Sequence, residues 1–400
     1  MTTYVHYRQQ SSVPLPSITV ELTERCNNDC LHCCINLPAG DSEARRRELN
    51  TAQVQEILRQ AADLGYGQVH LTGGEPLLRL DFEAIYLFAR RLGLDVLLFT
   101  NGRLITTHLA DLFAHIPPRV PIEITVYGMH AESYDAATRA PGAFAQFMRG
   151  VQRLWERKVP FVVKSAVLPS NRDEMDEFEA GPPGIPWKVT KPTYSLNFDL
   201  RSRRDNSERN RQIVAVRTPP RESIAIVMRD ATRFHPWTET LATKKLHPFG
   251  DRLFRCGACE GKTTCVDAYG VAQPCISLRA PGMTYALFGE SVETGHQEAT
   301  AQKIANPTAP LKLAIEHFTQ FGELRASNPE YLRRCARCFL KGICEQCPAK
   351  AWAEHGSFDT PVEYLCEMTH TWARHLGWLN EKEHGWEISG WQGRIPPVGQ

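Results

Sequence analysis

Three cysteines near the N-terminus are the residues of this chain best suited to chemistry. They lie in the segment Cys26-Asn27-Asn28-Asp29-Cys30-Leu31-His32-Cys33, with three and then two residues between successive thiols. Three thiolates on one short loop can ligate three irons of a [4Fe–4S] cube and leave the fourth iron open to another molecule. Zinc is the alternative, because His32 or Cys34 could complete the closed set of four ligands that it prefers. The spacing favours iron–sulfur, with Cys34 as a small apolar residue outside the ligand set.

A second group of cysteines lies in the C-terminal half, and none lies between Cys34 and Cys256. Its members are Cys256, Cys259, Cys265, Cys275, Cys335, Cys338, Cys344, Cys347 and Cys366. There is no signal peptide and no run near the roughly 18 apolar residues of a spanning helix, so we expect a soluble, cytoplasmic protein. Because the cytosol is reducing, clustered cysteines there indicate metal sites rather than disulfides. Two Cys-x-x-Cys pairs could form a zinc ribbon, but nine cysteines also fit two four-ligand sites with one left over.

The elements that must position the first cysteines alternate between strands and helices. The predicted strands are residues 18–22, 69–72, 96–99, 122–127, 161–168 and 194–200. The predicted helices are residues 52–64, 82–92, 105–114 and 144–155. This alternation predicts βαβ units and a parallel sheet, in which reactive groups gather at the carboxyl ends of the strands. The Pro- and Gly-rich residues 179–192 are predicted to form a loop, and residues 201–211 a charged, polar segment.

Further motifs follow the cysteine segment in order along these elements. They are Gly73-Gly74-Glu75-Pro76, Thr100-Asn101-Gly102, Glu123-Ile124-Thr125-Val126-Tyr127-Gly128 and Thr138-Arg139-Ala140-Pro141-Gly142-Ala143-Phe144. Together with the cysteine spacing they resemble the radical S-adenosylmethionine (radical SAM) family over roughly residues 17–175. The resemblance implies an α/β fold: a partial (β/α)6 TIM-like barrel followed by a small C-terminal cysteine-rich iron–sulfur domain.

The resemblance also implies a cofactor and a reaction. The open iron of the Cys26, Cys30 and Cys33 cluster would chelate S-adenosyl-L-methionine, whose reductive cleavage yields a 5′-deoxyadenosyl radical that abstracts hydrogen. The implied cofactor-binding residues are His32, Gly73, Gly74, Glu75, Pro76, Asn101, Arg139, Lys164 and Ser165.

Some of these residues have a physical reason for their role. Gly73 and Gly74 lack a Cβ and allow close approach to the methionine amine, from which Glu75 could accept a hydrogen bond. The planar guanidinium of Arg139 suits the methionine carboxylate, and suits a surface ion pair equally well. Lys164 and Ser165 are neighbours on one strand, so at most one of them points into the barrel.

The C-terminal cysteines resemble the SPASM extension, which carries two auxiliary [4Fe–4S] clusters. By that resemblance the first cluster uses Cys256, Cys259, Cys275 and Cys347, and the second uses Cys335, Cys338, Cys344 and Cys366. Cys265 is spare, although it competes with Cys259 for the first cluster. The chain departs from the family in having two residues, rather than three, between Cys344 and Cys347. Full ligation of both clusters favours a role in electron transfer.

The domain organisation expected from these features has five parts. They are an N-terminal segment (1–16), a radical SAM core (17–210), a bridging region (211–249), a SPASM-like domain (250–372) and a C-terminal tail (373–400) that is loose from Gly390. The formal net charge of +1 offers no electrostatic case for nucleic acid or an anionic membrane as partner.

The expected function is an oxidoreductase that matures a peptide or protein, as in modification of ribosomally made peptides (RiPPs) by cross-linking, epimerisation or oxidation. Its partners would be that substrate, an electron donor such as flavodoxin or ferredoxin, and a separate leader-recognition protein, because the segment before the first strand is short. Alternatives are a radical SAM enzyme acting on a sugar or other small molecule, and a zinc-stapled binding protein without catalysis.

A few other residues are candidates by location alone. Asp199 and Asp205 could serve as a general base for an oxidation, and Cys265 as a hydrogen donor for an epimerisation. Arg201, Arg203 and Arg204 could meet an acidic leader peptide, or could simply form a solvated charged loop.

Overall fold

The computed structural model describes residues 16–230, 246–288 and 310–395. The chain forms two compact units. The first unit comprises residues 1–195 and 257–319, and the second comprises residues 196–256 and 320–400. Among the described residues, no helix combines the length and the apolar character needed to cross a membrane.

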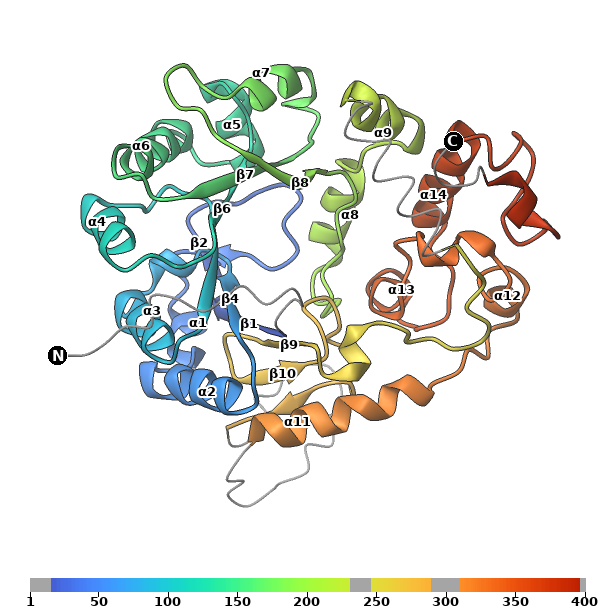
Figure 1. Ribbon diagram of the computed structural model, residues 1–400, viewed down its shortest axis with the longest axis horizontal. Coiled ribbons are helices and arrows are strands. Elements are labelled where there is room, and N and C mark those ends of the chain that lie inside the picture. The colour runs from blue at the N-terminus through green and yellow to red at the C-terminus, as the bar shows by residue number, and fades with distance from the viewer. Residues whose placement is uncertain (1–15, 231–245, 289–309, 396–400) are drawn as a thin grey trace. The chain divides into compact units, whose positions relative to one another are not determined.

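The first unit is built on a nine-stranded sheet (Figure 1). Its strands in chain order are β1 (Ser17–Thr23), β4 (Gln68–Gly73), β5 (Asp95–Thr100), β6 (Ile122–Val126), β7 (Phe161–Ala166), β8 (Val189–Ser195), β9 (Thr263–Val266), β10 (Val271–Gln273) and β11 (Tyr285–Ala286). The strands β1, β4, β5, β6, β7 and β8 pair in that order, and every pair is parallel. Strand β9 adds to the other edge of β1, also in parallel, and β10 and β11 follow as antiparallel strands. The predicted α/β class with parallel strands is therefore confirmed.

Helices connect these strands, as parallel pairing requires. They are α1 (Ser42–Arg47), α2 (Thr51–Asp63), α3 (Phe82–Arg91), α4 (Thr107–His115), α5 (Ala131–Thr138), α6 (Ala143–Glu156), α7 (Met175–Ala180) and, after β11, α11 (Pro310–Thr319). Figure 1 shows α2, α3, α4 and α6 along one side of the strands. Local sequence fixes where they begin: Asn50 and Gln53 form a reciprocal capping box for α2, and Thr106 caps α4.

The core lies between the sheet and these helices. Alternate strand residues are fully buried there, among them Ile18, Val69, Val96, Ile122 and Val163. Burial of each such side chain contributes about 1.5–3 kcal/mol. The opposite face of the sheet carries half-buried side chains, which include Thr19, His70, Phe99, Glu123 and Lys164. This second face is therefore the polar side of the parallel strands.

The structure corrects the prediction at the last strand of the parallel series. Strand β8 covers Val189–Ser195, whereas the sequence predicted a loop over 179–192 and a strand over 194–200. The loop prediction relied on prolines and glycines, but β8 is an edge strand, and an edge strand tolerates proline where its nitrogen faces away from the neighbouring strand. The sequence also missed α5 and α7, and it missed α8 (Ser207–Ala215) within its polar segment.

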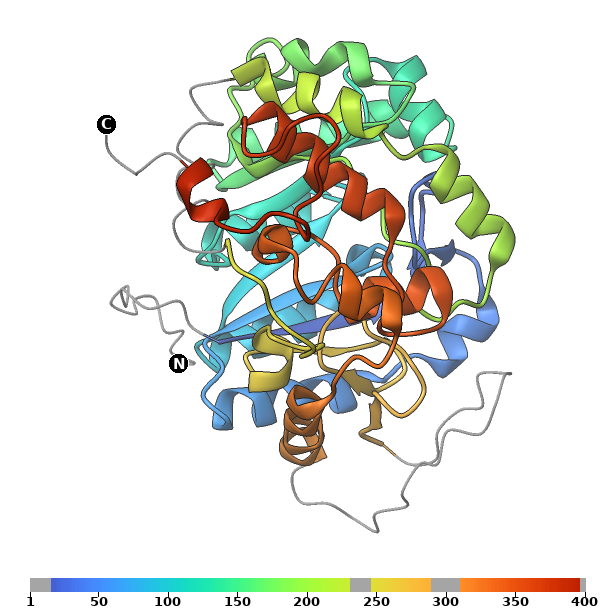
Figure 2. The same cartoon turned by 90° about the vertical axis from the view of Figure 1, so that its right-hand side faces the viewer.

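The second unit is mainly helical. Its helices are α8 (Ser207–Ala215), α9 (Pro220–Val227), α12 (Pro329–Arg333), α13 (Pro348–His355) and α14 (Glu363–His375). Short 3-10 turns include η6 (Phe339–Gly342) and η7 (Trp391–Arg394). Figure 2 shows the chain after α14 turning back toward that helix, and the Gly385 amide donates to His370 of α14 at 3.0 Å.

The C-terminal tail departs from expectation. It was predicted to be loose from Gly390, but the Trp391 ring stacks on Phe339 at 5.2 Å between centroids. Trp378 and Leu379 are buried in the same apolar cluster as Phe339 and Leu340. Aromatic and aliphatic side chains in the tail therefore bury apolar surface that a loose segment would expose. Pro396 and Pro397 lie outside the described residues.

The two units divide the chain differently from the predicted domains. The segment predicted as one domain over 250–372 is split, because residues 257–319 belong to the first unit. The cause is strand pairing: β9 hydrogen-bonds to β1, with Thr19 opposite Cys265. Such long-range pairing leaves no local sequence signal, since cysteine spacing dominates that stretch.

A buried arginine fastens the β9–β10 segment to β1. Arg279 is ion-paired with Glu21 of β1, and its guanidinium lies 3.5 Å from Glu24 and 3.7 Å from Asp267. All four side chains are almost completely buried. Removing one partner of a buried pair leaves charge that neither water nor protein compensates.

We therefore expect Arg279→Leu to lower the free energy of unfolding by about 3–5 kcal/mol. The matched control is Arg59→Leu, because Arg59 pairs with Glu56 and Asp63 on the exposed side of α2. Solvent screens that surface pair, so its loss changes little. Chemical denaturation of both variants measures the difference, and equal destabilisation would contradict a structural role for the buried cluster.

Candidate active site

The first cysteine segment follows β1 at the carboxyl end of the parallel strands. Cys26 lies in β2 (Arg25–Cys26), which pairs with β3 (Leu37–Pro38), and Cys30 is buried. Burial raises the pKa of Cys26 to about 12, and burial followed by the nearby Cys33 and Cys26 thiols raises the pKa of Cys30 well above its usual range. The structure thus brings the three predicted ligands within electrostatic reach of one another. Metal binding requires their thiolate forms.

The residues around these thiols fit an iron–sulfur cluster. Among the described residues, no three His, Cys, Asp or Glu side chains are placed to hold one metal ion. A [4Fe–4S] cube makes a different demand, because each thiolate binds a different iron. The Asn28 amide donates to Cys26 Sγ at 3.4 Å, and the Asn101 side-chain amide lies 3.9 Å from the same sulfur. Such N–H donors favour the thiolate form that a cluster needs.

Two arginines hold the cysteine segment in place. Arg139 Nε donates to the Asp29 carbonyl at 2.8 Å, and its terminal nitrogen pairs with the Asp29 carboxylate at 2.7 Å. Arg103 donates to the Asn27 carbonyl and to the Asn28 side chain. Arg139 thus makes the ion pair that the sequence left open, and its role toward a methionine carboxylate stays a prediction.

Glu75 connects the ends of β4 and β5. Its buried carboxylate accepts from the Leu77 amide at 3.0 Å, from the Asn101 amide at 2.8 Å and from the Thr100 hydroxyl at 2.9 and 3.0 Å. Burial raises the pKa of Glu75 to about 7, although these hydrogen bonds oppose the shift. The same Asn101 reaches Cys26, so Glu75 positions a neighbour of the cluster segment. Whether Glu75 also accepts from a methionine amine stays a prediction.

Gly73 and Gly74 are required by backbone packing. A Cβ on Gly73 would lie 2.1 Å from the Thr23 carbonyl oxygen, and one on Gly74 would lie 2.3 Å from that of Arg25. Their backbone meets the cysteine segment directly, since the Gly74 amide donates to Thr23 at 2.7 Å and the Glu75 amide to Arg25 at 2.9 Å. Next along the chain, Pro76 is buried and begins the 3-10 turn η1 (Pro76–Leu78).

Lys164 and Ser165 lie on opposite faces of β7. Ser165 is buried and donates to the Val126 carbonyl at 3.1 Å. Lys164 lies on the polar face, where it pairs with Glu123 and lies 5.0 Å from the Phe99 ring centroid. Neither Glu123 nor Phe99 was predicted as a site residue, although alternation along β5 and β6 could have placed both on this face.

His32 lies against Tyr127, an aromatic residue that was not predicted to have a role in the site. Its ring centroid is 5.7 Å from that of Tyr127, which follows β6. The Tyr127 ring in turn packs edge-on against Tyr134 of α5. Tyr134 is fully buried, so this aromatic group closes one side of the cysteine segment.

Comparison with known families agrees with this geometry. Residues 20–179 match the sequence model described as the Radical SAM superfamily. This part of the chain is a radical SAM domain. The match begins within β1 and ends within α7, so it includes the cysteine segment, the glycine pair and Arg139.

The relatives of the radical SAM domain include a heme synthase and a maturase. The AdoMet-dependent heme synthase of Methanosarcina barkeri is 26% identical over 357 residues, which are 85% of this chain and 93% of that protein. The mycofactocin maturase MftC of Mycolicibacterium smegmatis is 32% identical over 168 residues, which are 41% of this chain and 40% of that protein.

Solved structures share the fold beyond the radical SAM domain. The anSMEcpe enzyme with bound AdoMet has a TM-score of 0.56 at 14% identity, and the match covers 90% of this chain and 96% of that one. Streptococcus suis SuiB bound to S-adenosylmethionine has a TM-score of 0.57 at 13% identity, covering 88% of this chain and 75% of that one. At such identity the likeness concerns the fold alone.

Four cysteines outside the radical SAM domain also gather in the structure. They are Cys335, Cys338, Cys344 and Cys366, all in the second unit, and each lies within electrostatic reach of others in the set. Burial raises the pKa of Cys335 to about 11 and of Cys366 to about 12, and it raises the pKa of Cys338 further. This group coincides with the set predicted for the second auxiliary cluster, whose presence stays a prediction.

The set predicted for the first auxiliary cluster has members in both units. Cys259 and Cys275 belong to the first unit, whereas Cys256 and Cys347 belong to the second. This ligand set therefore stays a prediction. Cys265, which the sequence left spare, is fully buried in β9 and is electrostatically coupled to Cys275.

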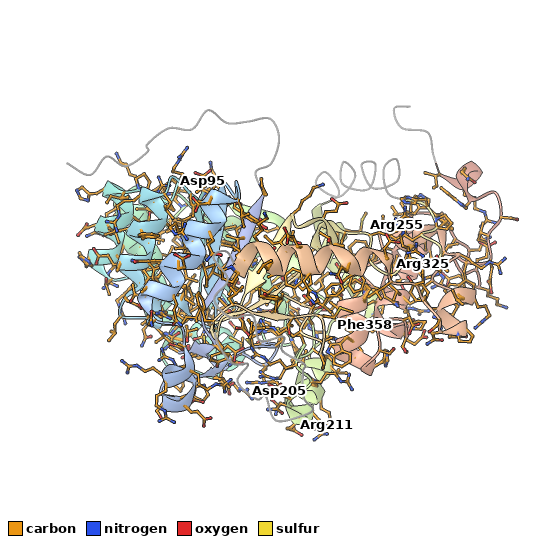
Figure 3. All side chains as sticks on the ribbon, turned by 90° about the horizontal axis from the view of Figure 1, so that it is seen from below. Asp95, Asp205, Arg211, Arg255, Arg325 and Phe358 are labelled. Atoms are coloured by element: carbon orange, nitrogen blue, oxygen red, sulfur yellow. The ribbon has the colours of Figure 1, made fainter. Side chains whose placement is uncertain are left out.

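The candidate bases Asp199 and Asp205 have ion-pair partners within the second unit. Arg201 and Arg204, which were predicted to meet a leader peptide, also have partners there. Asp199 pairs with Lys350 at 3.2 Å, and Asp205 pairs with Arg201. Burial acts to raise the pKa of Asp205, but Arg201 outweighs it and the pKa is lowered. Arg201 is buried rather than solvated, and Arg204 donates to two carbonyls of α13. Figure 3 labels Asp205 and Arg211 of the charged segment 201–211.

We expect Gly74→Ala to lower the thermal unfolding midpoint and the iron bound after reconstitution. The added methyl group must displace the backbone that leads to Cys26, and overpacking of this kind costs about 1–3 kcal/mol. Gly40→Ala is the matched control, because a Cβ there meets nothing within 4 Å. Unchanged iron and stability in Gly74→Ala would show that the glycine pair is not needed for packing.

Proposed function

We propose that the protein is a radical SAM enzyme that cleaves S-adenosylmethionine reductively and abstracts hydrogen from its substrate. The observation that carries this proposal is the convergence of Cys26, Cys30 and Cys33 at the carboxyl ends of a parallel sheet within the radical SAM domain. When bound, a [4Fe–4S] cluster and S-adenosylmethionine supply the 5′-deoxyadenosyl radical. We further propose that the sheet is a partial (β/α)6 barrel and that two auxiliary clusters complete the enzyme.

The contribution of the chain is to hold and shield these groups. Asn28 and Asn101 present N–H groups to Cys26, and Glu75 keeps Asn101 in position. Arg103 and Arg139 fix the shape of the cysteine segment. Cys30 is buried and Cys26 and Cys33 are partly buried, which limits the access of water that would cause side reactions.

We propose a peptide or protein as the substrate. Solved structures that share this fold include SuiB bound to the precursor peptide SuiA and anSMEcpe bound to the Cp18Cys peptide. Relatives of the radical SAM domain include MftC and the PqqA peptide cyclase of Xanthomonas campestris. The modification would be a cross-link, an epimerisation or an oxidation, with flavodoxin or ferredoxin as electron donor and a separate protein to recognise the leader.

Conversion of a heme precursor is the second candidate. The AdoMet-dependent heme synthases of Methanosarcina barkeri and Nitratidesulfovibrio vulgaris align over most of the chain. A third heme synthase, from Oleidesulfovibrio alaskensis, and the named maturases align over less than half of it. The heme synthase of Nitratidesulfovibrio vulgaris, for example, is 26% identical over 85% of this chain and 89% of that protein. A porphyrin is a small molecule, so this candidate belongs to the earlier alternative of a radical SAM enzyme that acts on a sugar or other small molecule. The radical chemistry is the same.

The reaction class is tested by anaerobic reconstitution, followed by dithionite and S-adenosylmethionine. We expect about twelve irons per chain, from three four-iron clusters, and formation of 5′-deoxyadenosine. The triple variant Cys26→Ala/Cys30→Ala/Cys33→Ala should lose all 5′-deoxyadenosine formation and about a third of the iron. Cys34→Ala is the control and should keep both. Bound zinc without iron, and no cofactor cleavage, would exclude radical SAM chemistry.

The substrate class is tested by adding candidate substrates to the reconstituted enzyme. Short peptides encoded beside the gene are compared with a porphyrin heme precursor. We expect a peptide to raise the rate of 5′-deoxyadenosine formation above the substrate-free rate. The mass of that peptide should also change. A response to the porphyrin alone would overturn the peptide proposal and establish the second candidate.

A further inference from the structure

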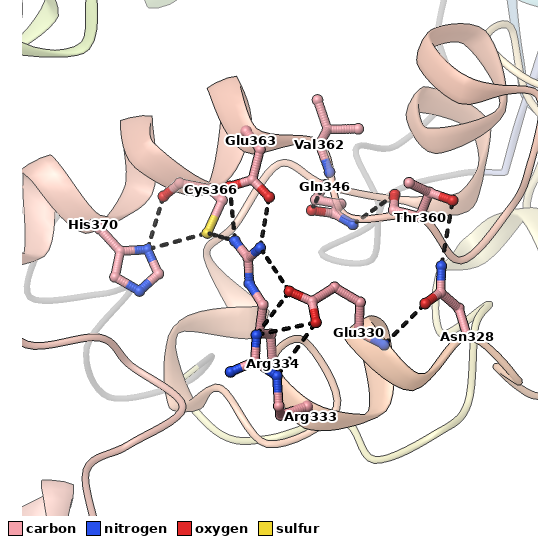
Figure 4. A network of polar contacts seen from close by, with 10 residues as sticks. All are labelled: Asn328, Glu330, Arg333, Arg334, Gln346, Thr360, Val362, Glu363, Cys366 and His370. Carbon is pink, nitrogen blue, oxygen red and sulfur yellow. Dashed lines mark hydrogen bonds and ion pairs between the residues drawn. The ribbon is translucent and has the colours of Figure 1, made fainter.

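An arginine lies beside the fourth cysteine of the group in the second unit. The Arg334 guanidinium donates to Cys366 Sγ at 3.5 Å, as Figure 4 shows. His370 lies on the other side of the same sulfur, with Nδ1 at 3.5 Å from Sγ and 2.8 Å from the Cys366 carbonyl. His370 Nε2 accepts from the Gly385 amide at 3.0 Å, so the proton of the neutral ring belongs on Nδ1. Two N–H groups therefore face Cys366.

Arg334 is fixed in this position. Its two terminal nitrogens donate to the Glu363 carboxylate at 2.6 and 2.8 Å, and its guanidinium lies 4.7 Å from the Trp386 ring centroid. The Arg334 side chain is 11% exposed, whereas that of Glu363 is 70% exposed. A second carboxylate, that of Glu330, lies 3.4 Å from the same guanidinium and is 46% exposed. Solvent therefore screens both carboxylates more than the guanidinium, and a positive charge remains beside the sulfur.

Two buried donors here have no hydrogen-bond acceptor among the described residues. They are Arg334 Nε and the indole Nε1 of Trp386. A buried donor without an acceptor costs about 1–3 kcal/mol, so such a pair indicates an acceptor that the protein chain itself does not supply. The sulfurs of an iron–sulfur cluster are acceptors of this kind.

The segment with Trp386 also closes over a second cysteine of the group. A Cβ on Gly385 would lie 2.7 Å from Cys338 Sγ, so only glycine permits this approach. The Gly385 carbonyl accepts from the Phe339 amide at 3.2 Å, which fastens the segment beside Cys338. The residues after α14 thus form one wall around these thiols.

We propose that Arg334 and Trp386 are positioning residues that donate N–H hydrogen bonds to the auxiliary cluster of Cys335, Cys338, Cys344 and Cys366 and raise its reduction potential. The inference rests on the auxiliary cluster of the proposed function. Reduction adds negative charge to the cluster, and a fixed cation together with N–H donors in need of an acceptor stabilises that added charge. This cluster is therefore more easily reduced than one surrounded by apolar groups alone.

The test is an EPR-monitored redox titration of reconstituted protein. The background is the triple variant Cys26→Ala/Cys30→Ala/Cys33→Ala, which removes the signal of the first cluster. Adding Cys335→Ala identifies which remaining signal belongs to this group. Arg334→Gln is compared with Arg333→Gln, a neighbour that loses the same charge but whose side chain is 62% exposed and pairs with Glu330.

We expect Arg334→Gln to shift the midpoint potential of this signal downward, with Arg334→Lys recovering part of the shift and Arg333→Gln causing little change. Trp386→Phe, which removes the indole N–H together with part of the ring, should also lower the potential. Equal potentials in Arg334→Gln and Arg333→Gln would overturn the inference. If Arg334→Gln fails to assemble the cluster, Trp386→Phe decides: a lowered potential supports the inference and an unchanged one overturns it. Absence of any signal lost with Cys335→Ala would instead refute the auxiliary cluster itself.

Discussion

The packing of the Gly73-Gly74-Glu75 backbone against the cysteine segment is the constraint on which the candidate site depends. The Gly74 and Glu75 amides donate to the carbonyls of Thr23 and Arg25, so the end of β4 sets the path of the chain into Cys26. The Glu75 carboxylate accepts hydrogen bonds from the Thr100 hydroxyl and the Asn101 amide, and so connects the same segment to the end of β5. One short segment therefore links two strands and the thiols, and no bulkier residue can replace the glycines without moving backbone.

Buried arginines play a related part elsewhere in the chain. In the first unit Arg279 offsets the charge of carboxylates that would otherwise be buried without compensation, and so attaches the β9–β10 segment to β1. In the second unit Arg334 lies between a carboxylate and a cysteine sulfur. The guanidinium suits both places because it stays charged when buried and donates in several directions at once. Fold and cysteine chemistry thus depend on the same side-chain type.

Much of the fold followed from local pattern, and the exceptions have physical causes. Apolar alternation located β1, β4, β5, β6 and β7, since each has one face in the core. Strand β8 was misplaced because prolines mark loops only where a ladder needs the missing N–H, and an edge strand does not. The segment from Gly390 was misjudged because Trp391 packs on Phe339, a contact that its own composition does not reveal.

The sequence by itself indicated the radical SAM domain, which the family match over residues 20–179 confirms, and it singled out three thiols within that domain as candidate ligands. It did so because ligand type and spacing on one loop are local properties. Only the tertiary structure decided the neighbours of those thiols. It paired Arg139 with Asp29, turned Glu75 inward, moved residues 257–319 into the first unit and placed Arg334 beside Cys366. These contacts join residues far apart in the chain, and no local pattern fixes which distant partner each side chain will meet.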